Sequence, residues 1–163
     1  MKNDKRQEYL DWDETFVLMS NLIAMRSKDP STQVGSCIVN NENVVVGLGY
    51  NGFPRGCHDD DLPWCRDGET SESKYAYVVH AEANAIMNAN DNVSGCRLYV
   101  SLFPCNECAK IIIQSGVKEV IYVSDKYANI DIFKIARKML ETAGIKLRQY
   151  EPQNRIELKK IDK

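Results

Sequence analysis

The chain has 163 residues, of which 44% are hydrophobic and 27% are charged, and its net charge is −2 with a pI of about 5.7. This length fits one domain with a buried core, and the composition is ordinary for a soluble globular protein. The slightly acidic balance argues against a duplex-binding surface, so we expect no nucleic-acid partner, although a small anionic substrate held by one or two basic side chains remains compatible.

Hydrophobic periodicity predicts a first helix and a hairpin, followed by alternating strands and helices. Asp29-Pro30 ends the first helix, and Asn41-Glu42-Asn43 is the hairpin turn. The predicted elements are a helix at 12–26, strands at 34–40 and 44–48, an irregular stretch at 48–68, a helix from 80, a strand from 97, a helix at 105–114, a strand at 119–123, a helix at 130–143, a strand at 145–150, and a tail at 151–163 with a further short strand at 156–158. This order predicts a single α/β domain over residues 1–163, with a mixed five-stranded sheet and helices on both faces.

Two short motifs place one histidine and two cysteines beside predicted helix starts. His80-Ala81-Glu82 opens one helix, and Pro104-Cys105-Asn106-Glu107-Cys108 opens another. One imidazole and two thiolates form a three-ligand zinc site, in which the fourth position is open for water, as in catalytic zinc sites. Such water has a pKa near 7, and Glu82 is placed to move its proton. The sequence therefore predicts a catalytic zinc ion bound by His80, Cys105 and Cys108.

Two other interpretations of the Cys-x-x-Cys pair are a redox pair and half of a structural zinc site. A structural site needs a fourth ligand, and the sequence has no second Cys-x-x-Cys. A redox pair would not need the upstream histidine. Catalytic zinc is the favoured interpretation. With two of the six cysteines assigned to metal, a charged N-terminus and no apolar run of about 18 residues, we expect a cytoplasmic protein with no signal peptide and no membrane partner.

The run Gly47-Leu48-Gly49-Tyr50-Asn51-Gly52 matches the dinucleotide fingerprint by letter. That fingerprint must open a helix, whereas Phe53-Pro54-Arg55-Gly56 follows here, so we reject it in favour of a glycine-rich turn. Asn51 leaves the sheet near the predicted zinc site, where its amide can bind a sugar hydroxyl.

Three further groups each admit two interpretations. Arg26, Lys28 and Asp29 form either a solvated helix end or an anion site. Lys126 and Tyr127, just past a strand, favour a phosphate contact over a plain loop, because open sheets bind ligands beyond the carboxyl ends of their strands. Cys57, His58 and Cys65 form either a second metal site or an ordinary loop; their spacing matches no standard module, which favours the loop.

These segments together resemble the deoxycytidylate (dCMP) deaminase family of the cytidine deaminase superfamily. The resemblance covers residues 9–150 and rests on the segments Arg26-Ser27-Lys28-Asp29-Pro30, Gly49-Tyr50-Asn51-Gly52, the His80 and Pro104 motifs, Ala109-Lys110, Gln114-Ser115-Gly116 and Ser124-Asp125-Lys126-Tyr127. The zinc motif alone, H-x-E followed by P-C-x-x-C, would indicate the superfamily but not the family within it.

The resemblance implies a three-layer α–β–α fold and zinc-dependent hydrolytic deamination of dCMP to dUMP, which supplies thymidylate synthesis. It assigns zinc binding to His80, Cys105 and Cys108, proton transfer to Glu82, and substrate binding to Asn51, Ala81, Lys126 and Tyr127. It also implies a homohexamer activated by dCTP, accompanied by Mg²⁺, and inhibited by dTTP, with Arg26, Lys28 and Asp29 as effector-site candidates. Some members bind a second zinc ion in the loop before the histidine helix, which Cys57, His58 and Cys65 match only loosely.

The mechanism expected from these residues begins with Glu82, which takes a proton from the zinc-bound water and protonates N3 of the cytosine. The hydroxide attacks C4, and Glu82 then passes its proton to the departing ammonia. Two alternatives share the zinc site: a deaminase of free cytidine nucleosides and a deaminase of single-stranded nucleic acid. The latter usually has a basic channel with stacking aromatic residues, which this acidic chain does not show. A non-catalytic zinc module would not need Glu82.

Overall fold

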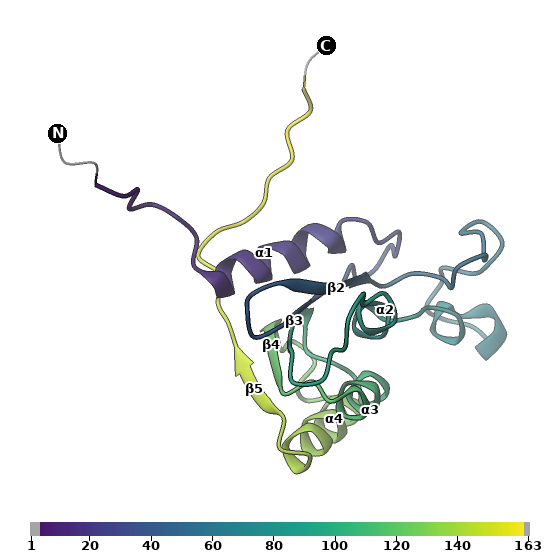
Figure 1. Cartoon of the computed structure of the whole chain (residues 1–163). Helices are drawn as coiled ribbons and strands as arrows, with labels where there is room; N and C mark the ends of the chain where they lie inside the picture. The colour runs from purple at the N-terminus through teal and green to yellow at the C-terminus, as the bar shows by residue number, and fades with distance from the viewer. Residues whose placement is uncertain (1–3, 162–163) are drawn as a thin grey trace.

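The computed structural model describes residues 4–161, in which helices and strands alternate along the chain (Figure 1). The first helix begins where the Asp11 side chain accepts a hydrogen bond from the N–H of Glu14 (2.7 Å), and the third ends at Gly116 in the left-handed conformation. The elements are α1 (Trp12–Ala24), β1 (Gly35–Val39), β2 (Val45–Tyr50), the 3-10 turns η1 (Thr70–Glu72) and η2 (Lys74–Ala76), α2 (Ala81–Met87), β3 (Arg97–Leu102), α3 (Asn106–Ser115), β4 (Glu119–Ser124), α4 (Asp131–Thr142) and β5 (Lys146–Gln149).

The five strands form one mixed sheet with the order β2-β1-β3-β4-β5. β1 pairs antiparallel with both β2 and β3, whereas β3, β4 and β5 run parallel. The carboxyl ends of β3 and β4 therefore meet at one edge of the sheet, which is where open α/β sheets bind ligands. The predicted mixed five-stranded sheet is confirmed.

Helices cover both faces of the sheet and bury a separate hydrophobic cluster on each (Figure 1). Alternate strand residues point to opposite faces, so Cys37 and Val39 pack under α1 while Ile38 points to the other side. The α1 face buries Phe16, Val17, Cys37, Val39, Tyr99 and Ile121. The face under α2, α3 and α4 buries, among others, Ile38, Ala85, Leu98, Val100, Ala109, Ile112, Val120, Ala136 and Leu140. The architecture is the expected three-layer α–β–α fold.

The glycines of β2 let α2 lie directly against the strand. A Cβ atom added at Gly47 would come within 2.4 Å of the Ala85 carbonyl oxygen, and one at Gly49 within 2.3 Å of the Ala81 carbonyl oxygen. Both distances are far shorter than van der Waals contact allows. The glycine pattern that matches a dinucleotide fingerprint therefore serves close strand–helix packing, which positions the helix that carries His80.

The predicted helices and strands agree with the observed ones to within about two residues at each end. One expected element does not form: residues 156–158 contain no strand, and the described tail runs extended away from the sheet (Figure 1). Pro152 follows β5 and has no N–H to continue a ladder. Within residues 4–161, no helix has the length and apolar character needed to cross a bilayer.

Candidate metal and substrate site

The three predicted metal ligands converge at the starts of two adjacent helices. His80 is the N-cap of α2, Cys105 is the N-cap of α3, and Cys108 lies in the first turn of α3. The Nδ1 atom of His80 lies 3.3 Å from Sγ of Cys105 and 3.4 Å from Sγ of Cys108. Within residues 4–161, this is the one group of three metal-binding side chains whose ligand atoms all lie within 4.8 Å of one another.

This geometry fits zinc. Tetrahedral coordination with Zn–N of about 2.0 Å and Zn–S of about 2.3 Å places nitrogen and sulfur ligands roughly 3.5 Å apart. The observed separations of 3.3 and 3.4 Å are close to that value. Two thiolates and one imidazole are also the ligand types that zinc favours, and three protein ligands leave one position for water.

The close approach of the three ligands shifts the pKa of each one. Hydrogen bonds from Cys108 and His80 lower the pKa of Cys105 to about 4, and the hydrogen bond to Cys105 raises the pKa of His80 to about 9. The pKa of Cys108 is raised because its thiol donates to Cys105 and is buried. Metal binding requires a neutral imidazole and thiolates, so a bound dication would displace the protons of His80 and Cys108.

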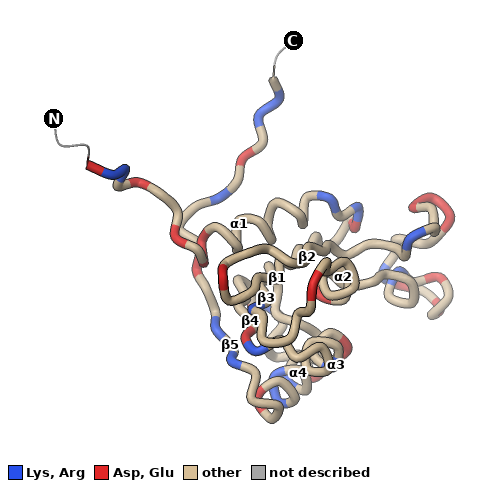
Figure 2. The backbone as a smooth tube through the Cα atoms, viewed as in Figure 1, with Lys and Arg blue, Asp and Glu red and all other residues tan. Residues whose placement is uncertain are grey.

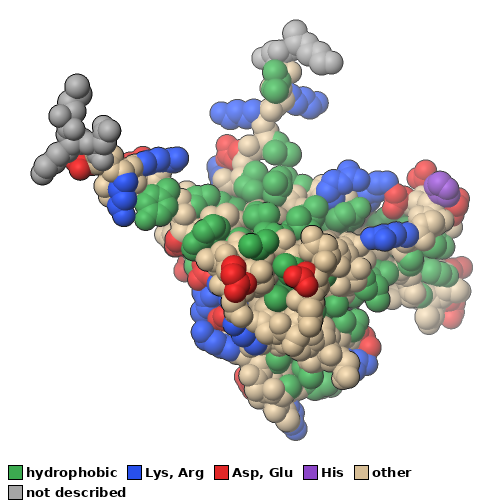
Figure 3. Space-filling view, in the orientation of Figure 1, with side chains coloured by type: hydrophobic (Ala, Val, Ile, Leu, Met, Phe, Trp, Pro, Cys, Tyr) green, Lys and Arg blue, Asp and Glu red, His purple; other side chains and the backbone are tan. Residues whose placement is uncertain are grey.

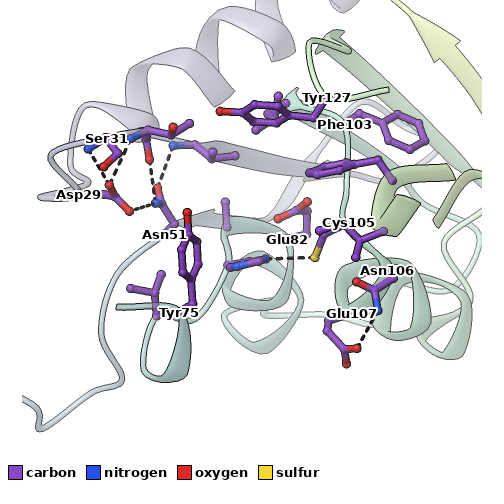
Figure 4. A pocket seen from close by; sticks show the side chains of 18 of the residues that line it. Asp29, Ser31, Asn51, Tyr75, Glu82, Phe103, Cys105, Asn106, Glu107 and Tyr127 are labelled. Atoms are coloured by element: carbon purple, nitrogen blue, oxygen red, sulfur yellow. Dashed lines mark hydrogen bonds between the residues drawn. The ribbon is translucent and has the colours of Figure 1, made fainter. Parts of the chain in front are cut away.

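Glu82 is buried beside this cluster, with 4% of its surface exposed, and lines the same cavity as His80 and Cys105 (Figure 4). Burial raises the pKa of its carboxyl group, which the charge of His80 partly opposes. Glu82 therefore presents a buried carboxyl group of raised pKa beside the candidate metal ligands, which is the arrangement that a general acid and base needs.

The cavity in front of the ligands has a volume of about 430 Å³, within the range of small-molecule sites. Its walls come from the loop after α1, the loop between β2 and α2, the starts of α2 and α3, and the loop between β4 and α4 (Figure 4). The residues lining it include Asp29, Thr32, Val34, Asn51, Arg66, Lys74, Tyr75, His80, Ala81, Glu82, Phe103, Cys105, Tyr127 and Phe133. The structure thus brings Asn51, Ala81 and Tyr127 together with the metal ligands.

The three effector-site candidates do not form one cluster within the chain. Asp29 is buried in the cavity wall, where Lys74 binds its carboxylate. Lys28 pairs with Asp59 outside the cavity, and the Arg26 guanidinium lies 6.0 Å from the centre of the Tyr50 ring.

Sequence reasoning missed Arg66. This exposed arginine lines the cavity and donates from Nε to the Tyr75 hydroxyl (3.0 Å), and no carboxylate within residues 4–161 forms an ion pair with it. Lys126 is exposed and outside the lining, with its ammonium 4.9 Å from the centre of the Tyr127 ring. A hydrogen bond with Thr32 and the charges of Lys126 and Arg66 lower the pKa of Tyr127. The cavity rim therefore combines two phenols with one unpaired guanidinium.

Cys57, His58 and Cys65 are not brought together. They belong to no group of three converging ligands among residues 4–161, and the Cys65 thiol donates instead to the backbone carbonyl of Glu72 (2.6 Å). The loop interpretation, favoured from their spacing, agrees with this arrangement.

Comparison with known proteins identifies relatives over most of the chain. The sequence model of the cytidine and deoxycytidylate deaminase zinc-binding region matches residues 10–124. Deoxycytidylate deaminases of Homo sapiens and Mus musculus are 56% identical over 151 residues, which is 91% of this chain and 85% of each relative. A probable deoxycytidylate deaminase of Drosophila melanogaster is 51% identical over 161 residues, covering 94% of this chain and 79% of that protein.

The fold is shared with a solved structure. The crystal structure of dCMP deaminase from the cyanophage S-TIM5, in complex with dCMP and dUMP, superposes with a TM-score of 0.71 at 26% identity. The superposition covers 88% of this chain and 100% of that chain. The shared fold therefore extends well beyond the segments that carry the zinc motif.

Proposed function

Because the chain belongs to the cytidine and deoxycytidylate deaminase family of hydrolases, we propose that it converts dCMP and water to dUMP and ammonia, using zinc. The observation that carries this proposal is the convergence of His80, Cys105 and Cys108 on one cavity with the buried carboxyl group of Glu82. A zinc ion held there supplies a water molecule whose pKa is lowered to about 7.

Glu82 carries the proton transfers. Its carboxylate accepts the proton that the attacking water gives up and delivers it to N3 of the cytosine, which makes C4 more electrophilic. Once the hydroxyl oxygen has bonded to C4, Glu82 would take the remaining hydroxyl proton and pass it to the leaving amino group as the C4–N4 bond breaks. Ammonia then departs, and dUMP is left with a carbonyl at C4 and a proton on N3. Burial of Glu82 supports both steps, because it raises the pKa of the carboxyl group above its usual value and so makes the carboxylate a stronger base.

The rest of the cavity provides contacts for the nucleotide. Asn51 and Ala81 line the wall near the metal ligands and are our proposed contacts for the nucleoside. Tyr127, whose ring centre lies 4.9 Å from the Lys126 ammonium, is our proposed contact for the phosphate, as expected from the sequence. We add Arg66 to that side, because its guanidinium lines the cavity and forms no ion pair with any carboxylate of residues 4–161, which suits it to a phosphate dianion.

We further propose a homohexamer regulated by dCTP, accompanied by Mg²⁺, and by dTTP, with dUMP feeding thymidylate synthesis. Hydrophobic side chains gather along α1 (Figure 3), where Trp12, Leu22 and Met25 are about half exposed and could pack against another subunit. Arg26 and Lys28 stay candidates for the effector, whereas the Asp29 carboxylate is occupied by Lys74. Basic and acidic segments are interspersed over the fold (Figure 2), which supports the expectation of no nucleic-acid partner.

The decisive experiment measures kcat and KM for dCMP, CMP and deoxycytidine, each with and without dCTP plus Mg²⁺. We expect a strong preference for dCMP that increases with dCTP, and light scattering should give the mass of six chains. Equal or better turnover of deoxycytidine would contradict the proposed phosphate contacts and favour a nucleoside deaminase.

A further inference from the structure

The hydrogen bonds of Asn51 fix which way its side-chain amide faces (Figure 4). Oδ1 accepts from the backbone N–H of Val34 (2.8 Å), and Nδ2 donates to the backbone carbonyl of Thr32 (2.9 Å) and to Oδ2 of Asp29 (3.3 Å). A backbone N–H can only donate, and a carbonyl or carboxylate oxygen can only accept. Turning the amide over would therefore break all three hydrogen bonds.

Lys74 holds Asp29 in the form that this arrangement needs. The Lys74 ammonium lies 2.5 Å from Oδ1 and 2.7 Å from Oδ2 of Asp29, and both side chains are about 95% buried. Burial alone would raise the pKa of Asp29, but hydrogen bonds from Lys74, Ser31 and Thr32 outweigh it and hold the pKa below its usual value of 3.8. At neutral pH, Asp29 is thus a carboxylate and accepts from Asn51.

Counting hydrogen-bonding capacity then leaves Asn51 one free site. A side-chain amide has two N–H donors and two lone pairs on its oxygen. Thr32 and Asp29 take both hydrogens, and Val34 takes one lone pair. Since Asn51 lines the cavity, it can offer a ligand one acceptor position on Oδ1 and no donor.

We propose that Asn51 recognises the substrate solely as a hydrogen-bond acceptor, and that Asp29 and Lys74 are positioning residues that fix this polarity. The inference rests on the proposed function, in which Asn51 contacts the sugar. dCMP has a single sugar hydroxyl, at C3′, because its 5′ oxygen carries the phosphate and C2′ has none. That 3′-hydroxyl must donate to Oδ1, and a nucleotide within a polynucleotide has an ester oxygen there that cannot donate.

The first test compares substrates on the unchanged, zinc-loaded enzyme. A 3′-fluoro analogue of dCMP keeps the size of the hydroxyl but cannot donate, whereas a 3′-amino analogue can. We expect kcat/KM to fall about ten- to a hundredfold for the fluoro analogue, because a buried acceptor loses its partner. The amino analogue should keep most of the activity, and a dinucleotide with a 3′-phosphodiester on the deoxycytidine should be turned over far more slowly than dCMP. Equal turnover of dCMP and the fluoro analogue would overturn the proposal.

The second test uses variants and follows the ratio of kcat/KM for dCMP to that for the fluoro analogue. Asn51→Ala removes the acceptor, so this ratio should approach one. The double variant Asp29→Asn/Lys74→Met removes both buried charges at similar volume and lets residue 29 present a donor or an acceptor to Asn51, so the ratio should fall. An unchanged ratio in either variant, when folded and zinc-loaded, would overturn the corresponding role.

A matched control applies the same two substitutions to an exposed ion pair. Asp131→Asn/Lys134→Met changes a pair on α4 that lies outside the cavity lining, so the ratio should stay as in the parent enzyme. Failure of the proposed function is distinguishable from failure of this inference. If the parent enzyme does not deaminate dCMP, the function fails; if it deaminates dCMP and the fluoro analogue alike, the acceptor-only role of Asn51 fails alone.

Discussion

Replacing Gly49 by alanine tests whether close packing of α2 on β2 sets the catalytic geometry. The added Cβ would lie 2.3 Å from the Ala81 carbonyl oxygen and 2.3 Å from the Ala85 nitrogen, whereas ordinary van der Waals contact begins at 3.4 Å. Relief of this overlap needs a movement of about 1 Å between β2 and the first turn of α2. His80 precedes that turn and Glu82 lies within it, so both would move with it.

Two effects of Gly49→Ala can be estimated. Overpacking of this kind costs about 1–3 kcal/mol of unfolding free energy. For a chain of this size that corresponds to a fall in Tm of about 2 to 12 °C. Misplacement of catalytic groups by about 1 Å can reduce the rate roughly a hundredfold. We therefore expect a folded but less stable protein whose kcat on dCMP falls by about two orders of magnitude.

The assay combines thermal unfolding, bound zinc and steady-state kinetics on dCMP. Gly52→Ala is the matched control, because its Cβ would meet only ring atoms of Tyr50 at 3.5 Å or more. This control should behave nearly as the parent protein does. Parent-like Tm and kcat in Gly49→Ala would refute the reasoning, since they would mean that α2 does not depend on the missing side chain.

Four further predictions concern single sites. Glu82→Gln should keep zinc, measured by metal analysis, and lower kcat about a hundred- to ten-thousandfold, because it removes the proton shuttle; near-normal turnover would contradict that role. Chelation, or Cys105→Ala, should lower Tm in thermal scans, since zinc binding adds stability to the folded state, and added zinc should restore only the unsubstituted protein. Arg66→Gln should raise KM for dCMP about ten- to a hundredfold and leave the kinetics on deoxycytidine unchanged. Its control is Arg55→Gln, in the same loop but outside the cavity lining, which should change the kinetics on neither substrate. Equal effects of Arg66→Gln on both substrates would exclude a phosphate contact. Burial alone would raise the pKa of Glu14, but hydrogen bonds from the C-terminal segment hold this pKa below 4.5. The stability that the Glu14 carboxylate adds is therefore present at neutral pH and is lost as the pH falls below 4.5. The Tm of Glu14→Gln should lack this decline at acid pH, and parallel curves of Tm against pH for the two proteins would contradict the prediction.

Much of the fold could be predicted from local sequence signals. A run of aliphatic and aromatic residues predicted β3, and β-branched residues predicted β4. Helical periodicity predicted α1 and α4, and Gly116 marked the end of α3. These signals depend on neighbours within a few residues, which the sequence displays directly. The expected strand at 156–158 does not form because a strand also needs a partner, and the chain after β5 runs away from the free edge of the sheet.

The site was predictable where residues act through spacing and less so where they act through distant partners. The ligand motif fixed the places of His80 and the two cysteines, and the structure brings them together as expected. Asp29 is different, because it binds Lys74, which lies 45 residues later in the chain. No local pattern indicates that pairing, so the sequence left the segment of Arg26, Lys28 and Asp29 open between a solvated helix end and an anion site.

The acidic residues at the start of α1 take their partners from the far end of the chain. Asp13 binds Arg148, and the Glu14 carboxylate accepts hydrogen bonds from Tyr150, Gln153 and Asn154, at separations of 135 to 140 residues. During synthesis, the first helix is therefore made long before the segment that completes it. A nascent chain would hold α1 incompletely docked until β5 and the residues after it leave the ribosome, so that the last step of folding closes the beginning of the chain onto its end.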